Sequence, residues 1–198
     1  MPLNFVSSGG GNPFIRFSVE DNEWVRSTPE GDLQTVDMTS APVLIDIENV
    51  QQGWLKLSGG RDWVEWPGND PSSTPKPSDQ HKQGISVNFY STKMFGDEPT
   101  REFCTSGVGS LEFIKKLYAA CEDKFGKGEI PVVHITGSTK VKIGKGNSRI
   151  PDFEIKGWKA KPDDMGAESV TSQQPPADVA SDTTAQVSAS DDVNFDEI

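Results

Sequence analysis

Four cations gather between residues 140 and 149, in a stretch that is also rich in glycine. They are Lys140, Lys142, Lys145 and Arg149, with Gly137, Gly144 and Gly146 close by. Side chains two residues apart on a β-strand point to the same face, so we expect Lys140 and Lys142 to share one face. Glycines let a backbone approach a phosphate chain closely. The pattern predicts a hairpin that contacts phosphates, and a solvated hairpin is the alternative.

Aromatic residues stand near cations at several other positions. Single-stranded nucleic acid is bound by rings that stack on bases, worth about 1–3 kcal/mol per base, and by cations that contact phosphates. In residues 84–95, the alternation predicts a core face with Phe89 and a polar face with Tyr90. Trp63 and Trp66 fall on opposite faces of a short strand, so at most one of them is expected in the core. The predicted DNA-binding residues are Trp54, Lys56, Arg61, Trp63, Lys82, Tyr90, Lys93, Arg101, Lys140, Lys142, Lys145, Arg149 and Trp158.

The charge of the chain changes sign along its 198 residues, whose formal net charge is −11. Residues 76–162 carry 15 basic and 10 acidic side chains, whereas residues 1–75 carry 4 basic and 11 acidic ones. Residues 163–198 hold nine acids and no Lys or Arg. A uniformly acidic surface would repel nucleic acid, but the positive middle block can bind an anion. This block also argues against a protein that mimics DNA.

Residues 162–198 are predicted to form a disordered acidic tail, because they are polar and show no hydrophobic periodicity. The end of the tail sets apolar residues among acids, which a tail that only confers solubility does not need. Such an end can bind a basic-rimmed pocket of a partner, or compete with nucleic acid for the protein's own cationic groove. The predicted partner-binding residues are Asp191, Asp192, Phe195, Asp196 and Glu197.

The elements that must position these residues are mostly strands. Residues 1–12 are expected to be a flexible arm, and residues 27–42 and 67–83 to be turns and loops. One helix is expected over 108–125, with Ser106 or Ser110 as its N-cap and Gly126 after its end. Strands are predicted within residues 13–26, 43–57 with a break near 51–53, 61–66, 84–95, 101–105, 131–143 and 150–159.

This order of elements favours a mainly β fold. One helix between the third and fourth of five main strands is the order of an OB-fold barrel, which binds oligonucleotides on one face. We therefore expect an OB-fold-like five-stranded barrel over residues 13–161. A β-sandwich with one helix is the alternative.

Signals for catalysis and metal binding are weak. The two cysteines do not form a CxxC pattern and the two histidines are isolated, so no zinc site is predicted. Three acids could hold Mg²⁺ in a small nuclease, although solvated strand faces have the same composition; they are Asp46, Glu48 and Glu154. We expect no enzyme activity and no cofactor.

Three stretches of the chain resemble a group of tailed-bacteriophage proteins associated with single-stranded DNA binding. They are Asp62-Trp63 with residues 77–84 (PSDQHKQG), residues 89–96 (FYSTKMFG) and Arg101-Glu102-Phe103. The acidic end NFDEI is similar in plan to the tails of bacterial and phage single-stranded DNA-binding proteins, but it ends in Ile198 instead of Pro-Phe. The resemblance covers roughly residues 12–161 and the plan of the tail. It implies an OB-fold, sequence-independent binding of single strands, and a role in phage DNA replication, recombination or repair.

The leading hypothesis is thus a non-enzymatic single-stranded DNA-binding protein in the cytoplasm, which would be that of the host cell for a phage protein. Its expected partners are single-stranded DNA, replication or recombination proteins that bind the tail, and further copies of the chain. No apolar run approaches the ~20 residues of a membrane span, so no membrane contact is expected. The main alternative is a β-rich virion structural or assembly protein with a disordered arm at each end.

Overall fold

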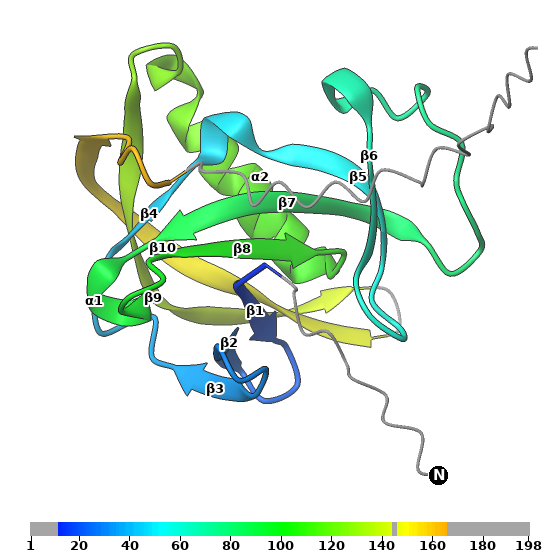
Figure 1. The fold of residues 1–198 in the computed structure, drawn as a ribbon, viewed down its shortest axis with the longest axis horizontal. Coiled ribbons are helices and arrows are strands. Elements are labelled where there is room, and N and C mark those ends of the chain that lie inside the picture. Colours follow the sequence, from blue (N-terminus) through cyan, green and yellow to red (C-terminus); the bar gives the residue numbers. More distant parts are fainter. Residues whose placement is uncertain (1–11, 144–145, 166–198) are drawn as a thin grey trace, which may run out of the picture. The chain divides into compact units, whose positions relative to one another are not determined.

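Nearly half of the described residues belong to one curled β-sheet (Figure 1). The structure is a computed structural model that describes residues 12–143 and 146–165. Residues 1–11, Lys145 and the predicted partner-binding residues Asp191, Asp192, Phe195, Asp196 and Glu197 lie outside the described residues. The strands are β1 (Phe14–Ser18), β2 (Glu23–Ser27), β3 (Leu33–Val36), β4 (Val43–Ile45), β5 (Gln51–Lys56), β6 (Asp62–Glu65), β7 (Lys82–Tyr90), β8 (Thr100–Thr105), β9 (Glu129–Ile143) and β10 (Gly146–Ala160).

The strands follow the order β10-β9-β4-β7-β8-β1-β2-β3 across the sheet. The first half of β7 pairs with β5, which in turn pairs with β6. β1 runs parallel to β8, and the other neighbouring strands are antiparallel. The prediction of a mainly β fold with one long helix is confirmed, but the described residues form an open ten-stranded sheet where a five-stranded barrel was predicted.

Two short strands lie along β7 where one broken strand was predicted. The break falls at residues 46–50, where the 3₁₀ helix η1 (Ile47–Asn49) separates β4 from β5. Gly53, at which the bend was expected, lies inside β5. A Cβ there would come 2.4 Å from the carbonyl oxygen of Val64 and 2.9 Å from the Trp63 ring. This glycine therefore allows close packing of β6 instead of a bend.

Other boundaries also differ from the prediction. β3 lies in the stretch expected to be only turns, because its exposed residues lack the alternation that marks a half-buried strand. β7 ends at Tyr90 because Ser91 begins the single turn α1 (Thr92–Phe95), with its Oγ accepting a hydrogen bond from the Met94 amide. Two further 3₁₀ helices are η2 (Pro67–Asn69) and η3 (Glu122–Lys124).

The predicted helix is present as α2 (Val108–Cys121), which packs an apolar stripe into the core. Phe113 and Leu117 have no exposed surface, and Phe113 packs edge-on against Phe153 of β10. The expected serine cap is wrong: the helix begins after Gly107, no side chain caps it, and Ser110 is buried. The helix also ends earlier than predicted, because η3 follows Cys121 directly.

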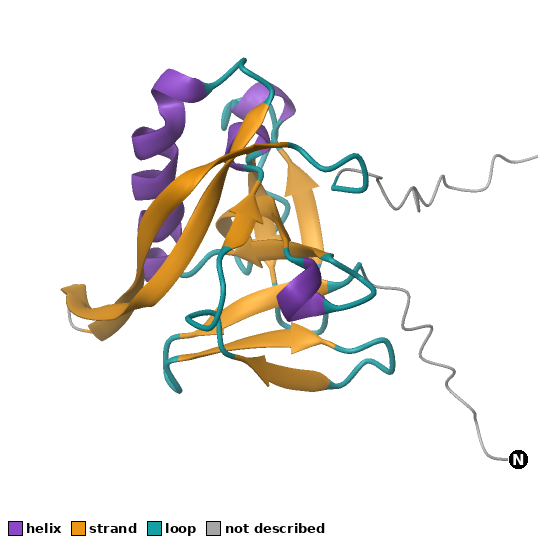
Figure 2. Cartoon of the chain, turned by 90° about the vertical axis from the view of Figure 1, so that its left-hand side faces the viewer, coloured by secondary structure: helices purple, strands orange, loops and turns teal. Residues whose placement is uncertain are grey.

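The strands β9 and β10 form a long hairpin that crosses α2 (Figure 2). Two register irregularities, after Ile135 of β9 and near Lys156 of β10, bend its strands. The chain after β10 stays packed, and Met165 is buried. Residues 162–165 were predicted to begin the disordered tail, and that part of the prediction is wrong. None of the helices in the described residues has the length and apolarity needed to cross a lipid bilayer.

Candidate nucleic-acid interface

Three cations share one face near the end of the β9–β10 hairpin. Lys140 lies directly opposite Arg149, and Lys142 lies opposite Asn147. Directly opposed residues of an antiparallel pair point to the same side, as do residues two apart. The prediction that Lys140 and Lys142 share a face is therefore confirmed, and Arg149 joins them. We call residues 138–143 and 146–149 the hairpin arm.

The cations of the hairpin arm have no carboxylate partner among the described residues. Lys140 and Lys142 are exposed, and the Arg149 guanidinium donates a hydrogen bond of 3.3 Å to the Ser138 hydroxyl. Like charges placed directly opposite on two strands destabilise the pair. An anion bound across Lys140 and Arg149 would remove that repulsion.

A second group of predicted residues lies on the outer face of β6, β7 and β8. The strand register places these side chains on the side of the sheet away from the core. Phe89 and Trp66, on the inner side, are buried, as predicted for Phe89 and for one of the two tryptophans. We call this surface the outer face; it carries Trp63, Lys82, Ser86, Asn88, Tyr90, Glu102 and Cys104.

The outer face already has internal partners for its polar groups. The Arg61 guanidinium pairs with the Glu102 carboxylate and lies 6.0 Å from the centre of the Trp63 ring. The Tyr90 hydroxyl donates a hydrogen bond of 3.3 Å to Asp164, just after β10. Burial, together with the charge of Asp164, raises the pKa of Tyr90. These contacts hold the rings of Trp63 and Tyr90 in place, and Glu102 neutralises the charge of Arg61.

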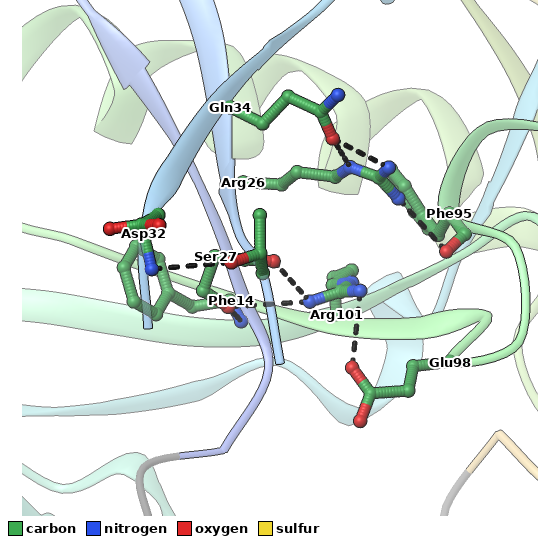
Figure 3. A network of polar contacts seen from close by, with 9 residues as sticks. Phe14, Arg26, Ser27, Asp32, Gln34, Phe95, Glu98 and Arg101 are labelled. Atoms are coloured by element: carbon green, nitrogen blue, oxygen red, sulfur yellow. Dashed lines mark hydrogen bonds and ion pairs between the residues drawn. The ribbon is translucent and has the colours of Figure 1, made fainter. Parts of the chain in front are cut away.

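Arg101 must be removed from the predicted DNA-binding residues, because its side chain is only 2% exposed. Figure 3 shows its guanidinium beside Ser27 and Glu98. Its guanidinium donates to the carbonyl oxygen of Ser27 at 2.8 Å and to the Ser27 hydroxyl at 3.3 Å. It also pairs with Glu98 at 3.2 Å. This arginine joins β8 to β2 inside the protein and presents no charge to a ligand.

Four more predicted residues lie away from both groups. The Trp54 indole donates to the Thr74 carbonyl oxygen at 2.9 Å and packs edge-on against Trp66, so the loop after η2 covers it. Lys56 pairs with Asp62 at 3.5 Å. Trp158 packs against the core, and Lys93 is exposed on α1.

The acids suggested for a nuclease have separate structural roles. Asp46 is buried and accepts a hydrogen bond of 2.6 Å from Lys161, whereas Glu48 accepts one from the Gly126 amide. Glu154 pairs with Lys156 on its own strand. No group of three or more His, Cys, Asp or Glu residues within the described chain could hold a metal ion. The three acids therefore contact three different partners and do not come together.

The two cysteine thiols are also poor nucleophiles. Burial raises the pKa of both Cys104 and Cys121 to about 11, so both thiols remain protonated at neutral pH. Cys121 is fully buried in α2. Neither thiol is suited to nucleophilic chemistry.

The sequence reading missed the side chains that join distant segments. The Ser138 hydroxyl, already bonded to Arg149, donates to the Asn22 side chain in the turn between β1 and β2. Asp164 on Tyr90 and Glu102 on Arg61 are further examples. Such contacts leave no signal in the spacing of residues, unlike local turns such as Asp37-x-Thr39 and Asp70-x-Ser72, in which the aspartate accepts hydrogen bonds from the residue two positions later.

Comparisons with protein-family models, with curated proteins and with solved structures found no match for this chain. The functional argument therefore depends on the geometry of the hairpin arm and the outer face.

Proposed function

We propose that this protein binds single-stranded DNA without strong sequence preference. The observation that carries the proposal is the cation pair Lys140–Arg149, directly opposed on an exposed strand pair, with Lys142 on the same face and no carboxylate partner in the described residues. Phosphate groups offer charge that would relieve this repulsion, and phosphate contacts position a strand without reading its sequence.

The order of the elements supports an OB-fold as the scaffold. If β4 and β5 count as one interrupted strand, then β7 and β8 are the second and third strands, α2 follows, and β9 and β10 are the fourth and fifth. β4 pairs with both β7 and β9, as the first strand of such a barrel would. The meander β1–β3 is an addition to the five-strand plan, next to β8.

This assignment gives the two candidate regions the expected places in an OB-fold. Oligonucleotides bind such barrels across the second and third strands and the loops after the first and fourth strands. The outer face of β7 and β8 is then the base-stacking surface, with Trp63 and Tyr90 as its rings. The hairpin arm is the second loop and contacts the phosphates. A strand lying across both would combine stacking with charge neutralisation.

The biological role we propose is in phage DNA replication, recombination or repair, with partner proteins bound through the acidic tail. The support comes from the sequence alone: the resemblance to tailed-phage proteins and the apolar residues set among acids near the end of the chain. We also propose that the tail competes with DNA for the cations. Binding that becomes tighter when residues 166–198 are removed, most of all at low salt, would support this competition.

The test of the proposed function is a titration of a fluorescently labelled, mixed-sequence oligonucleotide with the full chain, followed by anisotropy at several salt concentrations. Log K should fall with log salt by roughly 0.7 for each phosphate contacted. The triple variant Lys140→Ala/Lys142→Ala/Arg149→Ala should reduce that slope by roughly 2, because three contacts are lost.

The matched control removes three other cations, with the variant Lys115→Ala/Lys116→Ala/Lys127→Ala. These residues are exposed on α2 and just after it, and the variant has the same net charge as the hairpin-arm variant. Equal losses in both variants would mean that only total charge matters. No oligonucleotide binding by the wild type would reject the proposal and favour a virion structural role.

A further inference from the structure

The strand β3 forms one edge of the curled sheet (Figure 1), and β2 is its single neighbour in the described residues. Where the two strands meet at their turn, the Thr28 amide donates to the carbonyl oxygen of Asp32 at 2.8 Å. Opposed residues of an antiparallel pair alternate between bonded and non-bonded positions. In this register every second residue of β3 bonds to β2, so Leu33 and Thr35 direct their amide and carbonyl groups away from the sheet.

The contacts of β2 agree with this orientation of β3. Ser27 lies opposite Leu33, and its carbonyl oxygen accepts from Arg101 at 2.8 Å instead of from β3. The backbone groups of Leu33 and Thr35 have no partner in the described residues, and both residues are exposed. β3 therefore presents two amide donors and two carbonyl acceptors at a free edge, and such groups pair with an added strand.

Two other strands, β6 and β10, also have a single neighbour, and both carry features that discourage further pairing. β10 contains Pro151 and a register irregularity near Lys156, whereas β6 begins with Asp62 and ends with Glu65. Proteins protect the edges of their sheets with proline, charged residues and bulges. β3 has none of these in its sequence LQTV, and Leu33 is 50% exposed. Its edge is therefore open to another strand.

The segment that contains β3 is acidic. Residues 16–37 hold six acids and two arginines, which gives a net charge of −4. All six acids are exposed, and none pairs with a basic side chain in the described residues. They are Glu20, Asp21, Glu23, Glu30, Asp32 and Asp37. The Arg26 guanidinium donates to the Gln34 side chain and to the Phe95 carbonyl oxygen. The edge therefore repels phosphate and attracts a cationic strand.

We propose that the β3 edge binds an extended, basic segment of a partner protein by strand addition. The backbone of the partner bonds to Leu33 and Thr35, and its lysine or arginine side chains pair with the acids at the two ends of β3. A second copy of this chain is a poorer occupant, because it would bring the same unpaired acids together. The inference is independent of the proposed function, since no residue of the hairpin arm takes part in the pairing.

The experiment compares two labelled peptides of equal charge, whose binding to the full chain is followed by anisotropy. One has four Lys-Val repeats. The other has four Lys-Pro repeats and lacks every second amide donor. The wild type should bind the Lys-Val peptide about fivefold or more tightly, because only this peptide can complete the ladder. The Lys-Val peptide should also slow hydrogen exchange of the Leu33 and Thr35 amides.

Two variants of β3 and its turn test the two parts of the proposal. Thr35→Pro removes an outward amide and should abolish the preference for the Lys-Val peptide, whereas the matched control Thr35→Val keeps the amide and should retain the preference. Glu30→Gln/Asp32→Asn should weaken binding of the Lys-Val peptide about threefold, since two charges next to β3 are lost. Glu122→Gln/Asp123→Asn on η3 has the same net charge and should have a smaller effect.

Equal affinity of the wild type for the two peptides would overturn the inference, because charge alone would then explain the binding. Unchanged exchange of the Leu33 and Thr35 amides would also overturn it, as would full binding by Thr35→Pro. A dimer in sedimentation that Thr35→Pro dissolves would assign the edge to a second copy of the chain and reject a basic partner. Oligonucleotide affinity should be equal in Thr35→Pro and Thr35→Val, so failure at this edge leaves the proposed function standing.

Discussion

The hairpin arm and the outer face both carry basic side chains, but the two regions differ in whether an acid neutralises the positive charge. In the hairpin arm, Lys140 and Arg149 repel each other and have no carboxylate partner in the described residues. On the outer face, Arg61 is neutralised by Glu102, a carboxylate that is 12% exposed. The difference teaches that a cation near an aromatic ring in the sequence is a poor guide to a free charge. Charge available to a ligand is decided by which acids the fold brings alongside.

The largest effect expected from this comparison separates stability from binding. Arg101→Ala should lower the free energy of unfolding by about 3 kcal/mol, because a buried, hydrogen-bonded charge is lost between β8 and β2. Its oligonucleotide affinity, measured on the folded fraction, should not change. Arg149→Ala should leave stability within about 0.5 kcal/mol of the wild type and weaken binding. Urea unfolding and anisotropy measure the two quantities, and the opposite pattern would break the comparison.

The aromatic residues of the outer face should give the next largest effect. Trp63→Ala and Tyr90→Ala should each weaken binding by about 1–3 kcal/mol at fixed salt, because each ring would stack on one base. Trp63→Phe and Tyr90→Phe keep an aromatic ring and serve as controls that retain most of the affinity. If the alanine variants bind as the wild type does, the outer face does not contact bases and the hairpin arm acts alone.

A smaller effect is expected from freeing the paired cation of the outer face. Glu102→Gln removes the charge that neutralises Arg61, which should tighten binding by up to about 1 kcal/mol. The slope of log K against log salt should steepen by roughly 0.7, the value for one additional phosphate contact. Glu112→Gln on α2 is the matched control, since it frees Lys115, which does not lie on the outer face. Equal steepening in both variants would show a general charge effect.

The smallest effect concerns the contact between Tyr90 and Asp164. Asp164→Asn should change the affinity by only a few tenths of a kcal/mol, since one exposed hydrogen bond is altered. The pKa of Tyr90 should fall toward its ordinary value, because the neighbouring negative charge that raises it is gone. A titration of phenol absorbance in a Tyr118→Phe background isolates this group, as the chain has two tyrosines. An unchanged pKa would mean that burial alone raises it.

Periodic patterns predicted the local structure well where one side of an element is buried. The alternation in residues 84–95 placed Phe89 inside and Tyr90 outside, and the two-residue spacing placed Lys140 and Lys142 together. The same method failed for β3, whose residues are nearly all exposed and carry no alternating signal. It also failed at Gly53, because a glycine that bends a strand and one that admits a tryptophan ring look identical in sequence.

The sequence by itself determined the mainly β fold, the helix with its apolar stripe, and the shared face of the hairpin cations. These follow from periods of two and of about 3.6 residues, which depend only on local backbone geometry. Only the tertiary structure decided that Arg101 is buried, that Glu102 neutralises Arg61, and that Ser138 of β9 bonds to Asn22. Each of these joins segments far apart in the chain, and the free energy of such contacts depends on the whole sheet and not on local sequence.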